Sequence, residues 1–193
     1  MEISGSTAAG VIRVGLQVVS SHKKPMLEFY YEVRNRFGPE HEYEMPVGVS
    51  GKETKTQKTR FQDIFIQFYV VNIGGNRAEN IEFEVSGKLQ RNRPRESLGE
   101  IMETEIPQMA PGQIVHLFRF DDHDLNIYPG GGGKPLGIKA EELRIVAKYS
   151  ASPSLLNWIF SIHRKILRKK QYKSVFVFKP QMVCGDLPPA EYA

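Results

Sequence analysis

The sequence predicts an all-β protein, an antiparallel β-sandwich of about seven strands with one amphipathic helix inserted between the last two. In several short segments, apolar and polar residues alternate with a period of two, as in strands that bury one face. Segments rich in Gly, Pro and Asn separate these strands. The early connections carry no helical pattern of the kind that a parallel α/β sheet needs for its crossovers.

Four strands are expected in the first half of the chain. Residues 12–18 and 27–33 alternate regularly, and the second of these is the clearest strand pattern. The run FQDIFIQFYVVNI at 61–73 is apolar on both faces, which predicts a central strand covered on both sides or a strand at a subunit contact. The turn sequence NIGGN at 72–76 ends this run, and residues 81–85 alternate again.

Three further strands are expected in the second half, at residues 114–120, 143–149 and 174–179. A Pro-Gly turn at 111–112 precedes the first of them, and Pro180 ends the last. The strand at 143–149 repeats the alternation of apolar and polar residues, which again predicts one buried face.

Two long segments, 36–60 and 90–106, are polar with weak patterning, and we expect surface loops or excursions there. The expected domain organisation is one sandwich over residues 1–182 and a Pro-rich carboxy-terminal tail over 183–193. A chain of 193 residues suffices for an ordinary core in one such domain.

A helix is expected over residues 154–170, with Ser154 as its N-cap. Large apolar residues recur there at helical spacing, and basic residues crowd the second half. Trp158 beside these basic residues is a composition typical of interfacial helices. The helix either packs on its own sheet or presents its apolar face to a partner protein, a second copy or a membrane surface.

Charge is concentrated around this helix. The chain has a formal net charge of +4, and residues 143–185 hold nine basic and no acidic residues, so the remainder carries 4 − 9 = −5. Such a patch attracts phosphates, anionic lipid or an acidic partner. Nucleic acid is disfavoured, because the patch lacks interleaved aromatic residues and no recognition motif is present.

The usual signatures of catalysis and metal binding are missing or incomplete. The DDHD run at 121–124 offers hard oxygen ligands, but its spacing matches no calcium loop, so we expect a solvated strand end. GGGGK at 130–134 lacks the complete phosphate-loop pattern. Cys184, the one cysteine, has no evident activating partner. We therefore expect no catalytic residues, no metal and no cofactor.

The middle of the chain carries a family resemblance. FYVVNIGGNRAENIEFEVSG at 68–87 is followed by IPQMAPGQIVHLFRF at 106–120. These segments resemble bacterial immunoglobulin-like sandwich domains, in particular the cell-adhesion-related domain of bacteria (CARDB). The resemblance implies an immunoglobulin-like fold, a bacterial source and a non-catalytic binding or spacer role. Two features depart from the pattern: the chain lacks the antibody-type cysteine pair with its core tryptophan, and it carries the predicted helix.

The sequence thus predicts a non-catalytic interaction module that binds an unknown protein partner, or a second copy, through the basic helix or the loops. The side chains predicted to make the contact are Trp158, Ile159, Ile162, Arg164, Lys165, Ile166, Arg168, Lys169 and Lys170. Without a secretory signal or a spanning segment in the sequence, a cytoplasmic location is expected. The alternatives are a peripheral protein that docks the same helix on anionic lipid and, less favoured, a hydrolase with a site in the long loops.

Overall fold

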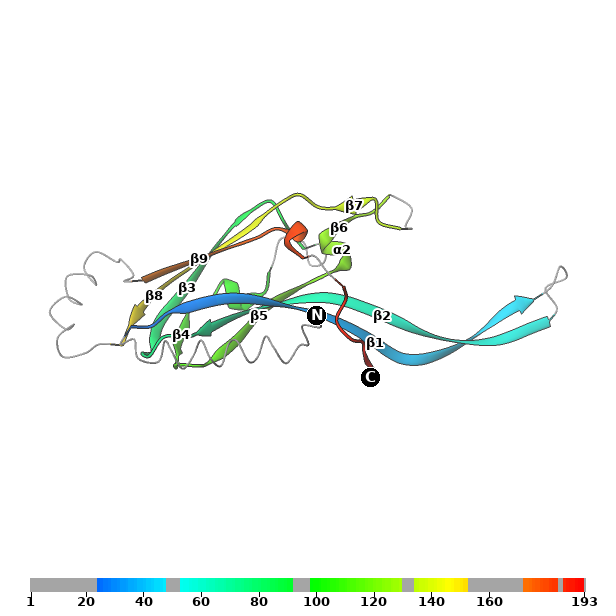
Figure 1. Cartoon of the computed structure of the whole chain (residues 1–193), viewed down its shortest axis with the longest axis horizontal. Helices are drawn as coiled ribbons and strands as arrows, with labels where there is room; N and C mark the ends of the chain where they lie inside the picture. Colours follow the sequence, from blue (N-terminus) through cyan, green and yellow to red (C-terminus); the bar gives the residue numbers. More distant parts are fainter. Residues whose placement is uncertain are drawn as a thin grey trace.

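Two four-stranded sheets lie face to face in the computed structural model, which describes residues 24–47, 53–91, 98–129, 134–152, 172–183 and 186–192 (Figure 1). The first sheet has the order β10-β1-β2-β5, and the second has the order β4-β3-β8-β9. All pairings are antiparallel except that of β10 with β1, which is parallel. The predicted all-β class is therefore confirmed.

The strands differ greatly in length. The first sheet consists of β1 (Leu27–Val47), β2 (Glu53–Asn72), β5 (Ile114–Asp121) and β10 (Glu191–Tyr192). The second consists of β3 (Ala78–Gly87), β4 (Ile106–Met109), β8 (Leu143–Ala151) and β9 (Tyr172–Phe178). A short pair, β6 (Asn126–Ile127) and β7 (Gly137–Ile138), lies beside the sandwich, and the helical turns are η1 (Glu100–Met102), α2 (Asp122–Leu125) and η2 (Pro180–Met182).

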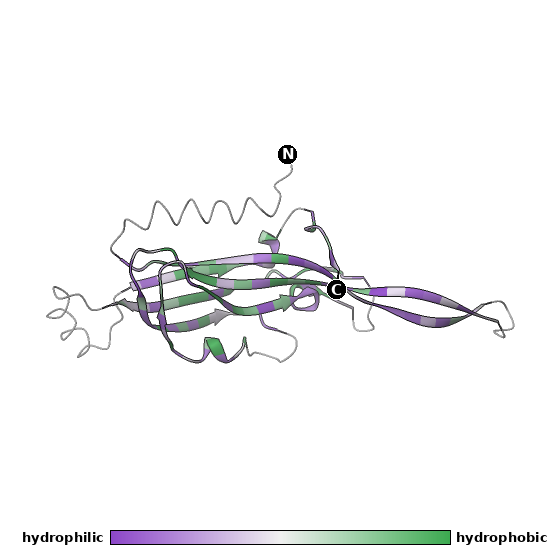
Figure 2. Ribbon diagram, turned by 90° about the horizontal axis from the view of Figure 1, so that it is seen from below, coloured by the Kyte–Doolittle hydropathy of each residue, from purple (hydrophilic) through white to green (hydrophobic). Residues whose placement is uncertain are grey.

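An aromatic core joins the two sheets. Phe68 of β2, 1% exposed, stacks on Phe118 of its own sheet with ring centroids 4.6 Å apart. Across the core it meets Phe178 of β9 edge-to-face at 4.8 Å. Figure 2 shows apolar residues concentrated along the strands of the sandwich. Burial of these rings is the main force that holds the sheets together, since apolar burial stabilises by about 25 cal/mol per Å².

Asn72 links two of the places where the chain passes from one sheet to the other, after β2 and after β4. Its backbone N–H donates to Gln113, and its carbonyl accepts from Gly112, so the end of β2 is bonded to the Pro-Gly turn before β5. Its fully buried side chain donates to the carbonyl of Met109, at the end of β4. The turn motifs at 72–76 and 111–112 therefore meet in space.

Six of the seven predicted strands coincide with β1, β2, β3, β5, β8 and β9. The seventh, at 12–18, and the helix predicted over 154–170 lie outside the described residues. The central position predicted for 61–73 is confirmed by burial within a single chain, since Phe65 and Val71 are 8% and 2% exposed.

Of the loops or excursions expected at 36–60, the structure shows an excursion, because β1 and β2 continue through most of the described part of this segment as a paired ribbon. The surface position expected for 90–106 agrees with most of the described residues of this segment, with two exceptions. There Leu98 and Met102 belong to the core, and Ile106 begins β4. Both segments are polar on average, but strand pairing and a few buried side chains decide their structure.

Within the described residues, no helix has the length and apolar character needed to cross a membrane.

Candidate interaction surface

The β1–β2 pair extends well beyond the sandwich as a two-stranded arm, which we define as residues 38–47 and 53–61 (Figure 1). The arm begins at a β-bulge, where Gly38 and Pro39 of β1 lie opposite the single residue Phe61 of β2. A bulge tolerates Pro39 because the extra residue leaves the ladder and needs no N–H donor. Beyond it, pairing runs without interruption from Glu40 opposite Arg60 to the end of β1, about 25 Å at the usual strand rise.

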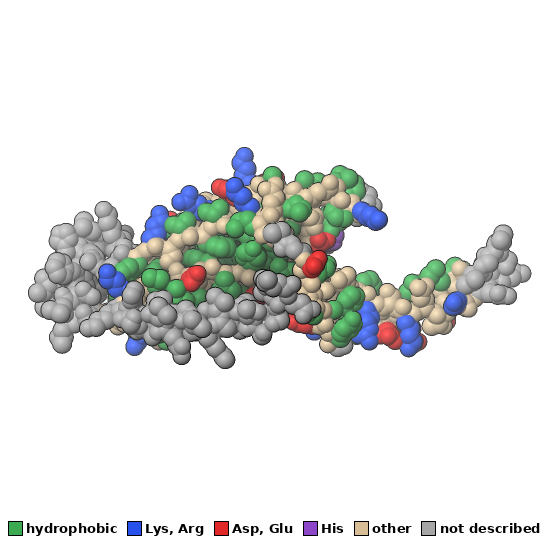
Figure 3. All heavy atoms as spheres, in the orientation of Figure 1, with side chains coloured by type: hydrophobic (Ala, Val, Ile, Leu, Met, Phe, Trp, Pro, Cys, Tyr) green, Lys and Arg blue, Asp and Glu red, His purple; other side chains and the backbone are tan. Residues whose placement is uncertain are grey.

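One side of the arm is charged, and its charges pair with one another. Lys58 Nζ lies 2.9 Å from Glu40 and 3.1 Å from Glu42, while Arg60 lies 3.7 Å from the other oxygen of Glu40. These ion pairs lower the pKa of the Glu40 carboxyl and raise the pKa of Lys58. Figure 3 shows the charged side chains along one side of the arm. Because the pairs are exposed, each contributes little to stability.

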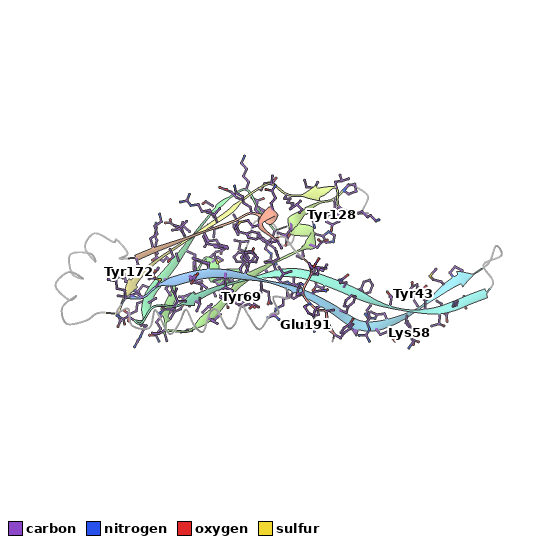
Figure 4. The ribbon with its side chains drawn as sticks, in the orientation of Figure 1. Tyr43, Lys58, Tyr69, Tyr128, Tyr172 and Glu191 are labelled. Atoms are coloured by element: carbon purple, nitrogen blue, oxygen red, sulfur yellow. The ribbon has the colours of Figure 1, made fainter. Side chains whose placement is uncertain are left out.

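The opposite side of the arm carries its aromatic and apolar residues, and we call it the apolar side. The polar residues Lys55, Gln57 and Thr59 of β2 share this side. His41, Tyr43 and Met45 follow each other at alternate positions of β1, so they share a face. Phe61 joins them at the bulge, with its ring centroid 5.7 Å from that of His41. Phe61 is 71% exposed, Met45 43% and Tyr43 41%. Tyr43 and Lys58 lie on opposite sides of the ribbon (Figure 4).

The sequence contains an alternating pattern that could have predicted this arm. The run EHEYEM at 40–45 alternates charged residues with larger, less polar ones at a period of two, as a two-faced strand does. A search for buried apolar faces overlooks such a strand, because neither of its faces reaches a core.

A second cluster covers the outer face of the first sheet, where Tyr30 and Tyr69 stack at 5.1 Å and His116 meets the edge of Tyr69 at 5.4 Å. Partial burial raises the pKa of both phenols, with the Glu32 carboxylate adding to it. Burial lowers the pKa of His116, and the positive charge of Arg119 adds a smaller effect in the same direction. These three groups are therefore neutral near pH 7.

The DDHD run does not form the solvated strand end predicted for it. Asp121 caps α2 by accepting from the Asp124 N–H at 3.1 Å, and the buried Asp124 accepts from the Asp121 N–H at 3.0 Å. Asp122 accepts from Asn126 and from Tyr128, and its carboxylate raises the pKa of Tyr128 to about 12. Across the described ranges, no three His, Cys, Asp or Glu side chains are placed to hold a metal ion.

The residues that the sequence predicts for the partner contact lie outside the described part of the chain, as do Gly130–Gly133 of the glycine run and Cys184. Four of the nine basic residues counted between 143 and 185 are described. Two of these pair with acids, Lys148 with Glu84 and Lys179 with Glu142, the latter at 3.5 Å. The basic character expected of this region is therefore partly neutralised on the second sheet.

Compared with known proteins, the chain matches no protein-family model, no curated protein and no solved structure. The resemblance to bacterial immunoglobulin-like domains accordingly stays a hypothesis drawn from the sequence.

Proposed function

We propose that this protein is a non-catalytic interaction module that binds a partner protein through the apolar side of the arm. The supporting observation is the exposure of Phe61, Tyr43 and Met45 on one side of a ribbon that projects from the sandwich. A two-stranded ribbon without a covering layer is only marginally stable in water. Exposed aromatic residues on such an element are well suited to bind a complementary surface.

The charge of the arm favours a protein over a polyanion as the partner. The arm holds four acids (Glu40, Glu42, Glu44, Glu53) and three bases (Lys55, Lys58, Arg60), a net charge of 3 − 4 = −1. Nucleic acids and anionic lipids are attracted by an excess of positive charge. The partner we propose therefore presents an apolar strip, with hydrogen-bonding groups for Tyr43, Gln57 and Thr59.

Site-specific photocrosslinking tests this proposal in cells that express the protein. A photoreactive phenylalanine analogue is introduced at Tyr43 or at Phe61, on the apolar side. The matched control carries the analogue at Glu42 or at Glu44, on the charged side of β1, the strand that contains Tyr43. We expect one discrete adduct from the apolar positions, identified by mass spectrometry, and at least a fivefold weaker adduct from the control positions.

Equal adducts from both sides of the arm, or none from the apolar side, would contradict the proposal. An adduct between two copies of this chain would identify self-association as the form that the contact takes. Because all four positions are exposed, none of the substitutions should disturb the core.

The basic helix predicted over 154–170 supplies a second proposal, in which the same protein docks on anionic lipid. The six basic residues among 164–173, with Trp158 and Ile162 on the same predicted helix, favour it. Sedimentation with liposomes that contain or lack anionic lipid tests it, with a Trp158→Ala, Ile162→Ala variant alongside. Binding that needs anionic lipid, weakens with salt and disappears in the variant is expected.

We further propose that the sandwich belongs to the immunoglobulin-like class of bacteria. The two antiparallel sheets are compatible with that class, and the turn motifs at 72–76 and 111–112 are the residues that suggested it.

A further inference from the structure

The segment 186–192 reaches the outer edge of β1 at the root of the arm, where Glu191 lies (Figure 4). β10 pairs parallel to β1, with Glu191 opposite Arg36 and Tyr192 opposite Phe37. More than 150 residues separate the partners in sequence, so their pairing depends on specific contacts and not on chain proximity. Three such contacts distinguish this segment from an arbitrary extended peptide.

The first contact uses a buried polar side chain. Asn35 of β1 is 7% exposed, and its Nδ2 donates to the carbonyl oxygen of Pro188 at 3.1 Å. Its Oδ1 accepts from Gln62 Nε2 at 2.8 Å, which fixes the direction of the amide. A buried amide donor needs a partner, because leaving it unsatisfied is costly. The edge of β1 therefore carries an oriented amide donor, Asn35 Nδ2, that hydrogen-bonds to a peptide carbonyl oxygen.

The second contact recognises a negatively charged side chain. Arg34 Nη1 donates to Glu191 Oε1 at 2.8 Å, while Nη2 donates to Glu32 Oε2 at the same distance. The hydrogen bond to Glu191 is the main cause that raises the pKa of Arg34. Because Glu32 holds one side of the guanidinium, the other side is oriented toward an incoming carboxylate.

The third contact recognises an aromatic ring. Tyr192 stacks on Phe37 with centroids 5.4 Å apart and an angle of 12° between the planes. The Arg60 guanidinium lies over the same ring, 5.7 Å from its centroid. The ring therefore has an aromatic partner on β1 and a cationic partner on β2.

We propose that the outer edge of β1 at Arg34–Phe37 is a peptide-binding site, which residues 186–192 occupy in cis. The ligand is an extended segment with a carbonyl placed for Asn35, then an acidic residue followed by an aromatic one. It adds a strand to the sheet edge, so backbone pairing supplies affinity and the three side-chain contacts supply selectivity. This site is distinct from the apolar side of the arm and does not depend on the function proposed for it.

The contacts that hold the segment are few enough to be exchanged. The Arg34–Glu191 pair is exposed, with 38% and 56% of the two side chains accessible, and exposed ion pairs contribute little to stability. The cis segment still competes strongly, because a tethered ligand has an effective concentration on the order of mM. A peptide in trans should therefore bind well only when the chain's own segment is weakened.

Two reciprocal full-length variants test the proposal. In Glu191→Lys the chain's own segment is repelled while Arg34 stays intact, and in Arg34→Glu the specificity of the site is reversed. The probe is the heptapeptide Asp-Leu-Pro-Pro-Ala-Glu-Tyr, fluorescently labelled and amidated, together with its Glu→Lys version. Fluorescence anisotropy measures saturable binding of each peptide to each variant and to the wild type.

We expect the parent peptide to bind the Glu191→Lys chain at least about tenfold more tightly than the wild type, because competition in cis is reduced. The Glu→Lys peptide should bind the Arg34→Glu chain and not the Glu191→Lys chain. The proposal would be overturned if the parent peptide showed no saturable binding to the Glu191→Lys chain and the Glu→Lys peptide showed none to the Arg34→Glu chain, while the near-ultraviolet circular dichroism of both chains remained native. Equal binding of both peptides to both variants would overturn it too, since the acidic residue would then not be recognised.

Discussion

At the scale of single residues, Asn72 shows how one side chain can organise a connection between sheets. Its Oδ1 accepts from the N–H groups of Met26 and Gly74, and its Nδ2 donates to the carbonyls of Asn76 and Met109. All four partners are backbone groups, so no other side chain of similar size satisfies them. Gly74 follows from the same geometry, since a Cβ there would lie 2.3 Å from the Lys24 carbonyl oxygen.

Replacing Asn72 with alanine should lower the free energy of unfolding by about 3 kcal/mol, because four backbone groups lose their partner and two of these hydrogen bonds are buried. Urea unfolding followed by circular dichroism measures the loss. Gln108→Ala is the control, since it removes only an exposed hydrogen bond to Arg77, and it should cost less than about 0.5 kcal/mol. A cost for Asn72→Ala no larger than that of the control would show that Asn72 is not the organising residue.

His116 should make stability depend on pH. Its pKa is lowered in the folded protein, so the unfolded chain takes up a proton first as the pH falls below about 6.5. The free energy of unfolding should therefore decrease from pH 7.5 to pH 5.5. His116→Gln cannot titrate and should lose less stability over the same interval, as measured by urea midpoints at both pH values. An equal or greater loss in the variant would contradict the assignment.

At the scale of elements, the bulge at Gly38 and Pro39 separates two parts of the same hairpin. Before it, alternate residues of β1 such as Phe29 and Tyr31 face the second sheet, with Phe29 packing on Phe176 and Tyr31 on Phe178. Beyond it, the described side chains of the arm are exposed except the half-buried Thr59. The hairpin therefore combines a core element with an element that contributes nothing to the core.

Replacing residues 38–61 by Asn-Gly should leave the sandwich folded, because this dipeptide forms a tight turn between Phe37 and Gln62. We expect the free energy of unfolding to change by less than about 1 kcal/mol, since the main loss is the Arg60 contact with Tyr192. Thermal unfolding by calorimetry checks this. A collapse of the cooperative transition would mean that the arm belongs to the folding unit.

At the scale of the whole molecule, stability depends on contacts that are distant in sequence. Phe68 of β2 meets Phe120 of β5 and Phe176 of β9 edge-to-face, at 5.5 and 6.3 Å. The hydroxyl groups of Tyr149 and Ser174, on the second sheet, bond to the backbone of Leu27 on the first, at 3.2 and 2.7 Å. Neither sheet can bury its inner face without the other.

Two phenylalanines of the same strand should therefore behave very differently. Phe68→Ala should cost about 4 kcal/mol, because it removes a ring from a closely packed core. Phe61→Ala, seven positions earlier on the exposed arm, should cost less than about 0.5 kcal/mol. Chemical denaturation of the two variants provides the comparison. Similar costs would mean that the arm is packed against the protein in solution.

Local patterns in the sequence were enough to predict the strands that border the core. In the segments at 27–33 and 143–149, the alternation of apolar and polar residues reports which side is buried, and this is a local property of the chain. The turn sequences at 72–76 and 111–112 are local patterns too, so they could be read from the sequence, whereas the bonds of Asn72 to Met26 and Met109 could not. The arm escaped this reasoning because its two faces differ in charge and not in burial.

Which edges and faces meet could not be predicted from the sequence and is seen only in the folded protein. Strand pairing brings three sets of residues together. Asn35 donates to the Pro188 carbonyl, the Tyr192 ring contacts Phe37 and Arg60, and Lys58 forms ion pairs with two glutamates. Pairing is set by contacts between distant segments, whose geometry exists only once both sheets have formed. The contacts at the edge of β1 and along the arm are therefore properties of the folded chain, whereas the strands are properties of the sequence.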